Sequence, residues 1–171
     1  MLFRSAAKVV GKSRHGTQDW TTAEMLGTPV FYFLYFMFVA MGMGGIFLAT
    51  GSSTLTKSWG LASIFATAQA LGLICNALSR PFWGWISDKS GRENTMIVAF
   101  FLQSIALVSL VQFGRTSAFL FTLTFCFTLF TWGEIYSLFP STVGDYFGSK
   151  NATSNNAFLY SAKGEIGRAH V

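Results

Sequence analysis

The chain has 171 residues, of which 51% are hydrophobic, 17% are aromatic and only 11% are charged, with a formal net charge of +5 at pH 7. An ordinary soluble domain contains about 25% charged residues, so this composition is typical of a membrane protein. No basic stripe with interleaved aromatic residues lies outside the apolar blocks, which argues against nucleic-acid binding.

The chain opens with a basic segment, residues 1–25, that has no apolar core of signal-peptide length. We interpret it as a cytoplasmic loop or tail rather than a targeting peptide. Four apolar blocks follow, each near the roughly 20 residues that a helix needs to cross a hydrocarbon core about 30 Å thick. They lie at residues 26–48, 59–87, 94–113 and 118–139.

A fifth apolar block begins near Asn155 and reaches Gly164, about half the length of a crossing. The blocks lack the alternating polarity that the strands of a membrane barrel require. The predicted fold is therefore an all-α membrane protein with four complete transmembrane helices and a truncated fifth. Cys75 and Cys126 lie within these blocks, where we expect them to be small apolar side chains.

Residues 165–171 break the apolar pattern and would place three ionisable residues in the fifth span, which is costly. This heptapeptide also resembles the translation of a common sequencing-library adapter, so we interpret it as a scar and exclude it from fold reasoning. We therefore give Arg168 and His170 no functional role and expect the chain to be a fragment whose last helix is cut short.

The charges in the loops predict the orientation, because basic residues favour the cytoplasmic side of a membrane. With the N-terminus inside, the basic residues of the inner loops clearly outnumber those of the outer loops. The inner set is Arg4, Lys8, Lys12, Arg14, Lys89, Arg92 and Lys150, and the outer set is Lys57 and Arg115. We predict a multi-pass integral membrane protein of the plasma (inner) membrane with a cytoplasmic N-terminus.

Nothing in the sequence indicates an enzyme. Neither His15 nor His170 lies near a plausible nucleophile, and the sequence contains no phosphate-binding loop or metal-ligand cluster. We predict no catalytic residue, no metal site and no cofactor.

Arg80 is a charge that lies deep inside an apolar block. It stands eight residues before Asp88 and the polar loop, which corresponds to a depth of about 12 Å at a helical rise of about 1.5 Å per residue. Snorkelling of the long side chain to the interface is one explanation. Helical steps of about 100° instead place Gln69 and Asn76 on nearly the same face as Arg80. We favour the second interpretation, because such a polar stripe predicts that these three residues line a cavity.

Two further ionisable residues lie within predicted spans. Lys163 is about nine residues into the fifth block, near mid-depth, where an ammonium group needs a partner or an aqueous cavity. Trp132 and Tyr136 are four residues apart and share a helix face, whereas Glu134 lies about 200° around the helix from Trp132. We therefore expect Glu134 to be apart from the aromatic pair, either as a proton-coupling group or, as we favour, as a structural partner of another helix.

The loop after the second block reads Gly84-Trp-Ile-Ser-Asp88-Lys89-Ser-Gly91-Arg92-Glu93. It resembles the G-x-x-x-D-[RK]-x-G-[RK]-[RK] signature of the major facilitator superfamily, from which Glu93 departs at the final basic position. Gly84 would permit close helix approach, Gly91 a tight turn, and Asp88 could cap and charge-pair the next helix. We predict a gating loop that latches two helices in one state and consists of Gly84, Asp88, Lys89, Gly91 and Arg92.

Three stretches together resemble the second half of the oxalate/formate antiporter family. They are Asp19-Trp-Thr-Thr-Ala-Glu-Met-Leu-Gly-Thr-Pro29-Val-Phe-Tyr, Ser79-Arg80-Pro-Phe-Trp-Gly-Trp-Ile-Ser-Asp88 and Tyr160-Ser-Ala-Lys163-Gly. The resemblance covers residues 19–164. It implies a C-terminal half-bundle of the major facilitator superfamily at residues 26–164, with helices seven to ten complete, helix eleven truncated and helix twelve missing.

The resemblance also implies a binding site. In that family an arginine on helix eight and a lysine on helix eleven bind a small dicarboxylate, and the matching residues here are Arg80 and Lys163. The family's aromatic wall on helix ten matches Trp132 and Tyr136. A guanidinium suits a bidentate carboxylate contact and an ammonium suits a point-charge contact, so the pair fits an anion with two acceptor ends.

We therefore hypothesise that the chain is a fragment of a secondary active transporter that exchanges small carboxylates, such as oxalate and formate, by alternating access. One alternative keeps the fold but couples a monocarboxylate to protons, with Glu134 as the coupling group; another is a non-transporting membrane receptor. The expected partners are the carboxylate anion, the lipid bilayer and a missing N-terminal half, without which the fragment should not transport alone.

Overall fold

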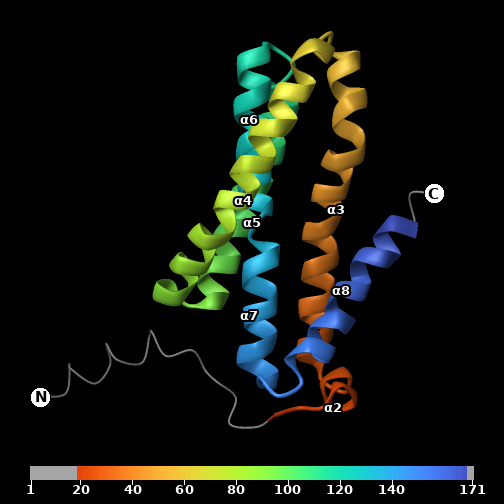
Figure 1. Ribbon diagram of the computed structural model, residues 1–171, viewed down its shortest axis with the longest axis vertical. Helices are drawn as coiled ribbons and strands as arrows, with labels where there is room; N and C mark the ends of the chain where they lie inside the picture. Colours follow the sequence, from red (N-terminus) through yellow and green to blue (C-terminus); the bar gives the residue numbers. More distant parts are fainter. Residues whose placement is uncertain (1–18, 169–171) are drawn as a thin grey trace, which may run out of the picture.

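The computed structural model describes residues 19–168, except for the side chains of a few positions that include Lys163. The residues named above that lie outside this part are Arg4, Lys8, Lys12, Arg14, His15 and His170. Within residues 19–168 every regular element is a helix (Figure 1). The helices are α2 (Thr22–Leu26), α3 (Pro29–Ser58), the 3-10 helix η1 (Ala62–Ile64), α4 (Phe65–Ser90), α5 (Arg92–Phe113), α6 (Ala118–Trp132), α7 (Ile135–Phe147) and α8 (Ala152–Arg168).

Within residues 19–168, four helical segments are long and apolar enough to cross a membrane, which confirms the predicted all-α membrane fold. Their bounds are Pro29–Leu48, Ala62–Ser90, Arg92–Phe113 and Ala118–Phe147. Large apolar side chains along them, such as Phe33, Phe36 and Phe119, are exposed within the chain. In a bilayer such side chains contact lipid tails, so the exposed surface of this bundle suits a hydrocarbon solvent.

Two helices extend beyond the apolar blocks. α3 continues to Ser58, past the predicted end at residue 48, and several polar side chains in its last turns hydrogen-bond to carbonyls of the helix itself. The buried hydroxyl of Thr56, for example, donates to the carbonyls of Ser52 and Ser53. α8 begins at Ala152 and runs through Gly164, so the adapter-like residues 165–168 continue the helix. Hydropathy reports where apolar side chains end, whereas the backbone hydrogen bonds of a helix can continue further.

The fourth span is broken between α6 and α7. α6 ends at Trp132, and Gly133 and Glu134 form a two-residue turn before α7 begins. At this turn the Tyr136 amide donates to the Gly133 carbonyl at 3.4 Å, three residues back rather than four. The prediction of one helix over residues 118–139 missed this break, because apolar composition does not report the hydrogen-bond pattern of the backbone.

α4 and α6 approach each other closely where small residues face the neighbouring helix. A Cβ at Gly72 would lie 2.5 Å from Cδ1 of Leu129. A Cβ at Gly133 would overlap the Ser79 hydroxyl and approach the Asn76 carbonyl oxygen to 2.8 Å. Glycine at these two positions therefore lets the two helices pack at a distance that any side chain would prevent.

Side-chain hydrogen bonds reinforce the same contact. Asn76 Nδ2 donates to the Leu129 carbonyl at 2.9 Å, and Trp83 Nε1 donates to the Phe130 carbonyl at 3.1 Å. Both acceptors lie in the last turn of α6, where the Leu129 carbonyl also accepts from the Gly133 amide at 3.1 Å. α4 thus supplies hydrogen bonds that stabilise the end of α6 before the break.

Two apolar clusters fill the bundle. One is built around Phe38 of α3, whose ring centroid is 5.2 Å from Phe139 of α7 and 5.2 Å from Tyr160 of α8. The other includes Phe125 of α6 and side chains from α3, α4 and α5. Trp132 packs against both clusters, so the end of α6 joins the two halves of the core.

The first described residues pack on the end of the bundle where α7 and α8 meet (Figure 1). The Trp20 amide donates to the Phe147 carbonyl at 2.9 Å, and the Thr22 hydroxyl donates to Asn155 Oδ1 at 2.9 Å. Residues 19–25, which the sequence analysis grouped with the basic tail, are therefore part of the folded unit.

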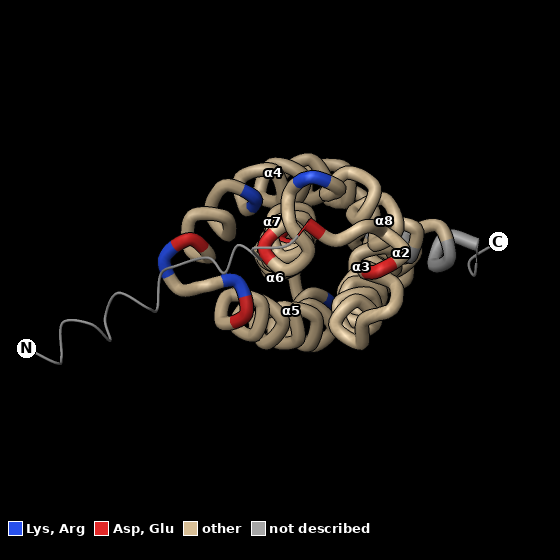
Figure 2. Tube along the Cα trace, turned by 90° about the horizontal axis from the view of Figure 1, so that it is seen from below, with Lys and Arg blue, Asp and Glu red and all other residues tan. Residues whose placement is uncertain are grey.

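Charged residues are few along the helices (Figure 2). Lys89 and Arg92 flank the turn between α4 and α5, and Lys150 lies between α7 and α8, at the end of the bundle that carries α2. Lys57 and Arg115 lie at the opposite end. The two predicted sides of the membrane thus correspond to the two ends of the bundle, while the orientation itself stays a prediction.

We predict that Gly133→Ala destabilises the bundle and that Gly144→Ala does not. The methyl group at residue 133 overlaps the Ser79 hydroxyl and forces α4 away from α6, and overpacking of this kind costs about 1 to 3 kcal/mol. A Cβ at Gly144 meets nothing within 4 Å. Unfolding in denaturing detergent, followed by circular dichroism, compares the two variants. Equal stabilities would contradict the close contact at Gly133.

Candidate functional site

Arg80 lies on the part of α4 that reaches α7. Its guanidinium carbon is 4.7 Å from the centroid of the Tyr136 ring, a cation–π contact of the kind that contributes about 0.5–2 kcal/mol. The side chain is exposed within this chain. It forms no ion pair with a carboxylate of the described residues. The contact holds a positive charge against α7 within a membrane-spanning segment.

Trp132 and Tyr136 form the aromatic part of the same group. Their ring centroids are 5.6 Å apart, and the rings are nearly perpendicular at 81°. Trp132 lies against α3, where a Cβ at Gly45 would overlap its ring. We call Arg80, Trp132 and Tyr136 the Arg80 cluster. It brings together three of the residues that the sequence analysis proposed for substrate binding.

Tyr160 of α8 also belongs to this region, although the sequence analysis did not propose it as a site residue. Its ring packs on Phe38, and it lies within electrostatic range of Arg80 and Tyr136. A signal was available, because Tyr160 lies three residues before Lys163 and so shares its helix face. The phenol hydroxyl adds a hydrogen-bond donor at the edge of the Arg80 cluster.

Lys163 lies on α8, but its side chain is outside the described residues. Its backbone position is about one helical turn beyond Tyr160. α8 packs against α3 and α7, the helices that also surround the aromatic rings. The structure thus gives the place of this residue on its helix, while its contact with the Arg80 cluster stays a prediction.

The predicted polar stripe of α4 meets two different neighbours. Asn76 is buried, and its amide nitrogen is engaged in the hydrogen bond to α6. Gln69 is half-buried, and its Oε1 has no hydrogen-bond partner among the described residues. Arg80 reaches α7 instead, since α4 passes the end of α6 at this level. A cavity-lining role for Gln69 and Asn76 stays a prediction.

Glu134 is completely buried at the break between α6 and α7. Neither of its carboxyl oxygens has a hydrogen-bond partner among the described residues. The structural partner that the sequence analysis favoured is therefore not found among the described side chains.

The predicted gating loop forms an ion network at the end of the bundle. Arg92 pairs with Asp88 at 2.9 Å and with Asp145 of α7 at 3.2 Å, and it also donates to the Ser87 hydroxyl. Gly91 adopts a φ of +88°, a conformation that suits glycine, at the turn between α4 and α5. The network therefore joins this turn to α7.

Other residues of the loop depart from the expected roles. The N-cap of α5 is Gly91, without a side-chain cap, so the interaction of Asp88 with this helix is an ion pair. Lys89 lies over the Trp85 ring at 3.8 Å. A Cβ at Gly84 would meet nothing within 4 Å, so the expected close helix approach there is absent from the described chain. Glu93 accepts a hydrogen bond from Tyr146 of α7.

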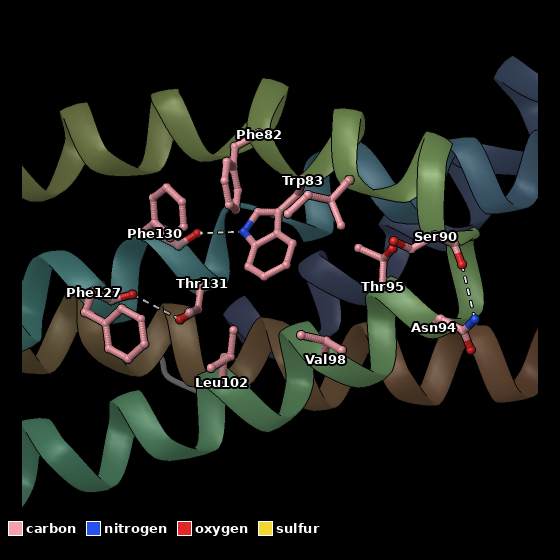
Figure 3. A pocket seen from close by; sticks show the side chains of 11 residues that line it. Phe82, Trp83, Ser90, Asn94, Thr95, Val98, Leu102, Phe127, Phe130 and Thr131 are labelled. Atoms are coloured by element: carbon pink, nitrogen blue, oxygen red, sulfur yellow. Dashed lines mark hydrogen bonds between the residues drawn. The ribbon is translucent and has the colours of Figure 1, made fainter.

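A separate groove of about 270 Å³ lies among α4, α5 and α6 (Figure 3). Its walls include Phe82, Trp83, Val98, Leu102 and Phe130, and no charged side chain lines it. An anion would find no counter-charge there, so we do not assign this groove to carboxylate binding. Among residues 19–168, no cluster of His, Cys, Asp and Glu could hold a metal ion.

Comparisons with known proteins add independent information. The family model described as Major Facilitator Superfamily matches residues 3–169. The "Oxalate:formate antiporter" of Oxalobacter formigenes is 35% identical over 85% of this chain and 35% of its own length. The "Uncharacterized MFS-type transporter YhjX" of Escherichia coli (strain K12) is 25% identical over 93% of this chain and 40% of its own length. "Apicoplast pyruvate carrier 1" of Toxoplasma gondii is 26% identical over 84% of this chain and 29% of its own length. The chain thus spans between 29% and 40% of the length of these relatives.

We predict that Asp145→Asn loosens the end of the bundle at which α5 and α7 meet. The substitution removes a charged acceptor from the partly buried Arg92 guanidinium, a loss of about 1–3 kcal/mol. Faster hydrogen–deuterium exchange in the last turn of α7 is the expected result. Arg115→Gln, at an exposed position on the opposite end, is the control. Unchanged exchange in Asp145→Asn would mean that this ion pair does not hold α7 in place.

Proposed function

The chain belongs to the Major Facilitator Superfamily, and on this premise we propose that it is part of a secondary transporter that exchanges small carboxylate anions by alternating access. The observation that carries the proposal is the Arg80 cluster, in which a guanidinium lies against an aromatic pair within a membrane-spanning segment. Ionisable side chains in such segments are costly, so they are retained mainly where they serve a substrate or ion.

The chemistry of Arg80 suits a carboxylate. A guanidinium that stacks on a ring keeps N–H donors in its own plane, and two of these donors match the two oxygens of a carboxylate. No carboxylate among the described residues occupies this position. We therefore propose that a carboxylate group of the substrate binds Arg80, with Tyr136 holding the guanidinium in place.

A second cation would make the site suitable for a dicarboxylate. Lys163 lies one turn beyond Tyr160, which is within electrostatic range of Arg80. We propose that its ammonium group contacts the other end of the anion. The relative named "Oxalate:formate antiporter" supports this choice of substrate class. Oxalate has two carboxylate ends and formate has one, so one site of this kind can accept both.

Exchange follows from the charges of the empty site. Without an anion, two like charges would stay poorly compensated when the cavity closes, so return of the empty carrier is disfavoured. Arg80 is exposed within this chain, and the relatives are much longer than the chain. We therefore propose that an N-terminal half outside this chain provides the opposing wall of the site.

We further propose that the end of the bundle bearing Lys89, Arg92 and Lys150 faces the cytoplasm, in the plasma (inner) membrane. The support is the excess of basic residues in the loops on that side, which includes the N-terminal segment.

A monocarboxylate is the second candidate cargo. One of the similar proteins is named as a pyruvate carrier, and pyruvate has a single carboxylate. Such a substrate would need Arg80 but not Lys163. Competition between oxalate and pyruvate for uptake into proteoliposomes distinguishes the two cargo classes.

In a full-length transporter that contains this segment, we predict that Arg80→Gln and Lys163→Ala reduce oxalate exchange at least about tenfold. The loss of a charged hydrogen bond costs about 1.5–3 kcal/mol, which corresponds to about one to two decades in affinity. Uptake of labelled oxalate into oxalate-loaded proteoliposomes measures the effect, with Arg115→Gln as the matched control.

Normal oxalate exchange by either variant would contradict the proposed site. Retention of pyruvate uptake in Lys163→Ala, with loss in Arg80→Gln, would instead support the monocarboxylate. Circular dichroism of the purified variants checks that each one is folded.

A further inference from the structure

The carboxyl group of Glu134 is buried at the α6–α7 break without a hydrogen bond to any described residue. Its exposure is 0%, and neither Oε1 nor Oε2 has a hydrogen-bond partner among the described residues. The backbone of the same residue is engaged, since its carbonyl accepts from the amides of Ser137 and Leu138 at 3.0 and 2.8 Å. The turn therefore uses the Glu134 backbone, while the acid group has no hydrogen bond within the described part of the chain.

The described titratable side chains of the helices packed around α7 do not pair with Glu134. Arg80 of α4 lies over Tyr136, and at the far end of α7 Arg92 of α5 pairs with Asp145. Glu93 of α5 accepts from Tyr146 at that same end. The other titratable groups of the surrounding helices include Tyr35 on α3, Cys75 on α4, Cys126 on α6 and Tyr160 on α8. None of these described groups forms a hydrogen bond or ion pair with Glu134.

A carboxyl group in these surroundings fits as a neutral acid. An ionised carboxylate would have lost its hydration without gaining a described cation or donor, and burial of such a charge is strongly unfavourable. A proton on Glu134 removes this penalty. Buried acids that can gain and lose a proton are the usual components of proton pathways in membrane transporters.

Two buried N–H donors near the end of α6 have no hydrogen-bond partner among the described residues. Thr131, one turn before Glu134 on the same helix face, donates to Gln103 Oε1 of α5. Gln103 Nε2 is buried without a partner among the described residues, and so is Trp132 Nε1. A carboxylate accepts from such N–H groups, so a rearrangement that brought Glu134 to them would stabilise its ionised form.

The backbone at Glu134 is suited to such a rearrangement. The turn at Gly133 and Glu134 interrupts the fourth span, and its Tyr136 to Gly133 hydrogen bond is long at 3.4 Å. Movements of helices in proteins concentrate at a few residues of this kind, where elements end. Tyr136, the residue that contacts Arg80, lies only two residues further along, so movement of the turn reaches the Arg80 cluster directly.

We infer that Glu134 is a proton-binding site, which holds a proton in the packed arrangement and releases it to water when the α6–α7 turn opens. The step is a simple acid dissociation, in which the O–H bond of the carboxyl breaks, the electron pair stays on the carboxylate and the proton passes to a water molecule. The consequence of this inference for transport is that proton movement through Glu134 is coupled to movement of the carboxylate substrate at Arg80. This consequence rests on the proposed function, whereas the protonation of Glu134 does not.

Infrared spectroscopy of this chain in lipid vesicles tests the protonation without any transport. The expected result at neutral pH is a carbonyl stretching band of a protonated carboxylic acid, which is lost in Glu134→Gln and shifted in Glu134→Asp. Glu24→Gln, at an exposed carboxyl of α2, is the matched control and should leave the band unchanged. Absence of the band in the folded wild-type chain, or its persistence in Glu134→Gln, would overturn the inference.

Transport by a full-length carrier that contains this segment tests the coupling. An inward acid gradient should stimulate carboxylate uptake by the wild type, and Glu134→Gln should lose this stimulation. Arg80→Gln should lose oxalate exchange even without a gradient. Wild-type exchange that does not respond to the gradient would overturn the coupling while the proposed function stands. Absence of wild-type exchange would refute the proposed function, and the infrared band would still decide whether Glu134 carries a proton.

Discussion

The close contact of α4 with α6 is the constraint on which the rest of this bundle depends. In a bilayer the apolar surface of a helix gains little by leaving lipid, so helices associate through close packing and hydrogen bonds. Gly72 and Gly133 provide the close packing, and the side chains of Asn76 and Trp83 provide hydrogen bonds to carbonyls at the end of α6. Both carbonyls lie in the last turn of α6, so the contact is made directly before the break.

The break has two consequences for function. It allows α7 to present Tyr136 to Arg80, which forms the Arg80 cluster, and it leaves Glu134 buried at the turn itself. In an uninterrupted helix, the rotations of Trp132, Glu134 and Tyr136 about the helix axis would be fixed relative to one another. The break removes this constraint. The proposed proton site therefore lies within the short irregular segment, and the proposed anion site takes Trp132 and Tyr136 from its two flanks, which offers a physical route for coupling them.

The ion network at the end of the bundle contacts α7 near its C-terminus. Arg92 links the turn between α4 and α5 to Asp145 of α7. Glu93, where the superfamily signature has a basic residue, accepts from Tyr146 and so adds a second link between α5 and α7. α7 is held at its far end by this network and at its near end by the turn at Gly133.

The sequence by itself determined the membrane class, the all-α fold and the four spans, because hydropathy and charge are properties that add up along a chain and need no knowledge of contacts. Helical periodicity and family resemblance also grouped Trp132 with Tyr136 and singled out Arg80. The break at Gly133, the hydrogen bond of Asn76 to α6 and the packing of Tyr160 on Phe38 came only from the tertiary structure. The physical reason is that these features depend on the axial offset and rotation of one helix relative to another, which are decided by packing between residues far apart in the sequence.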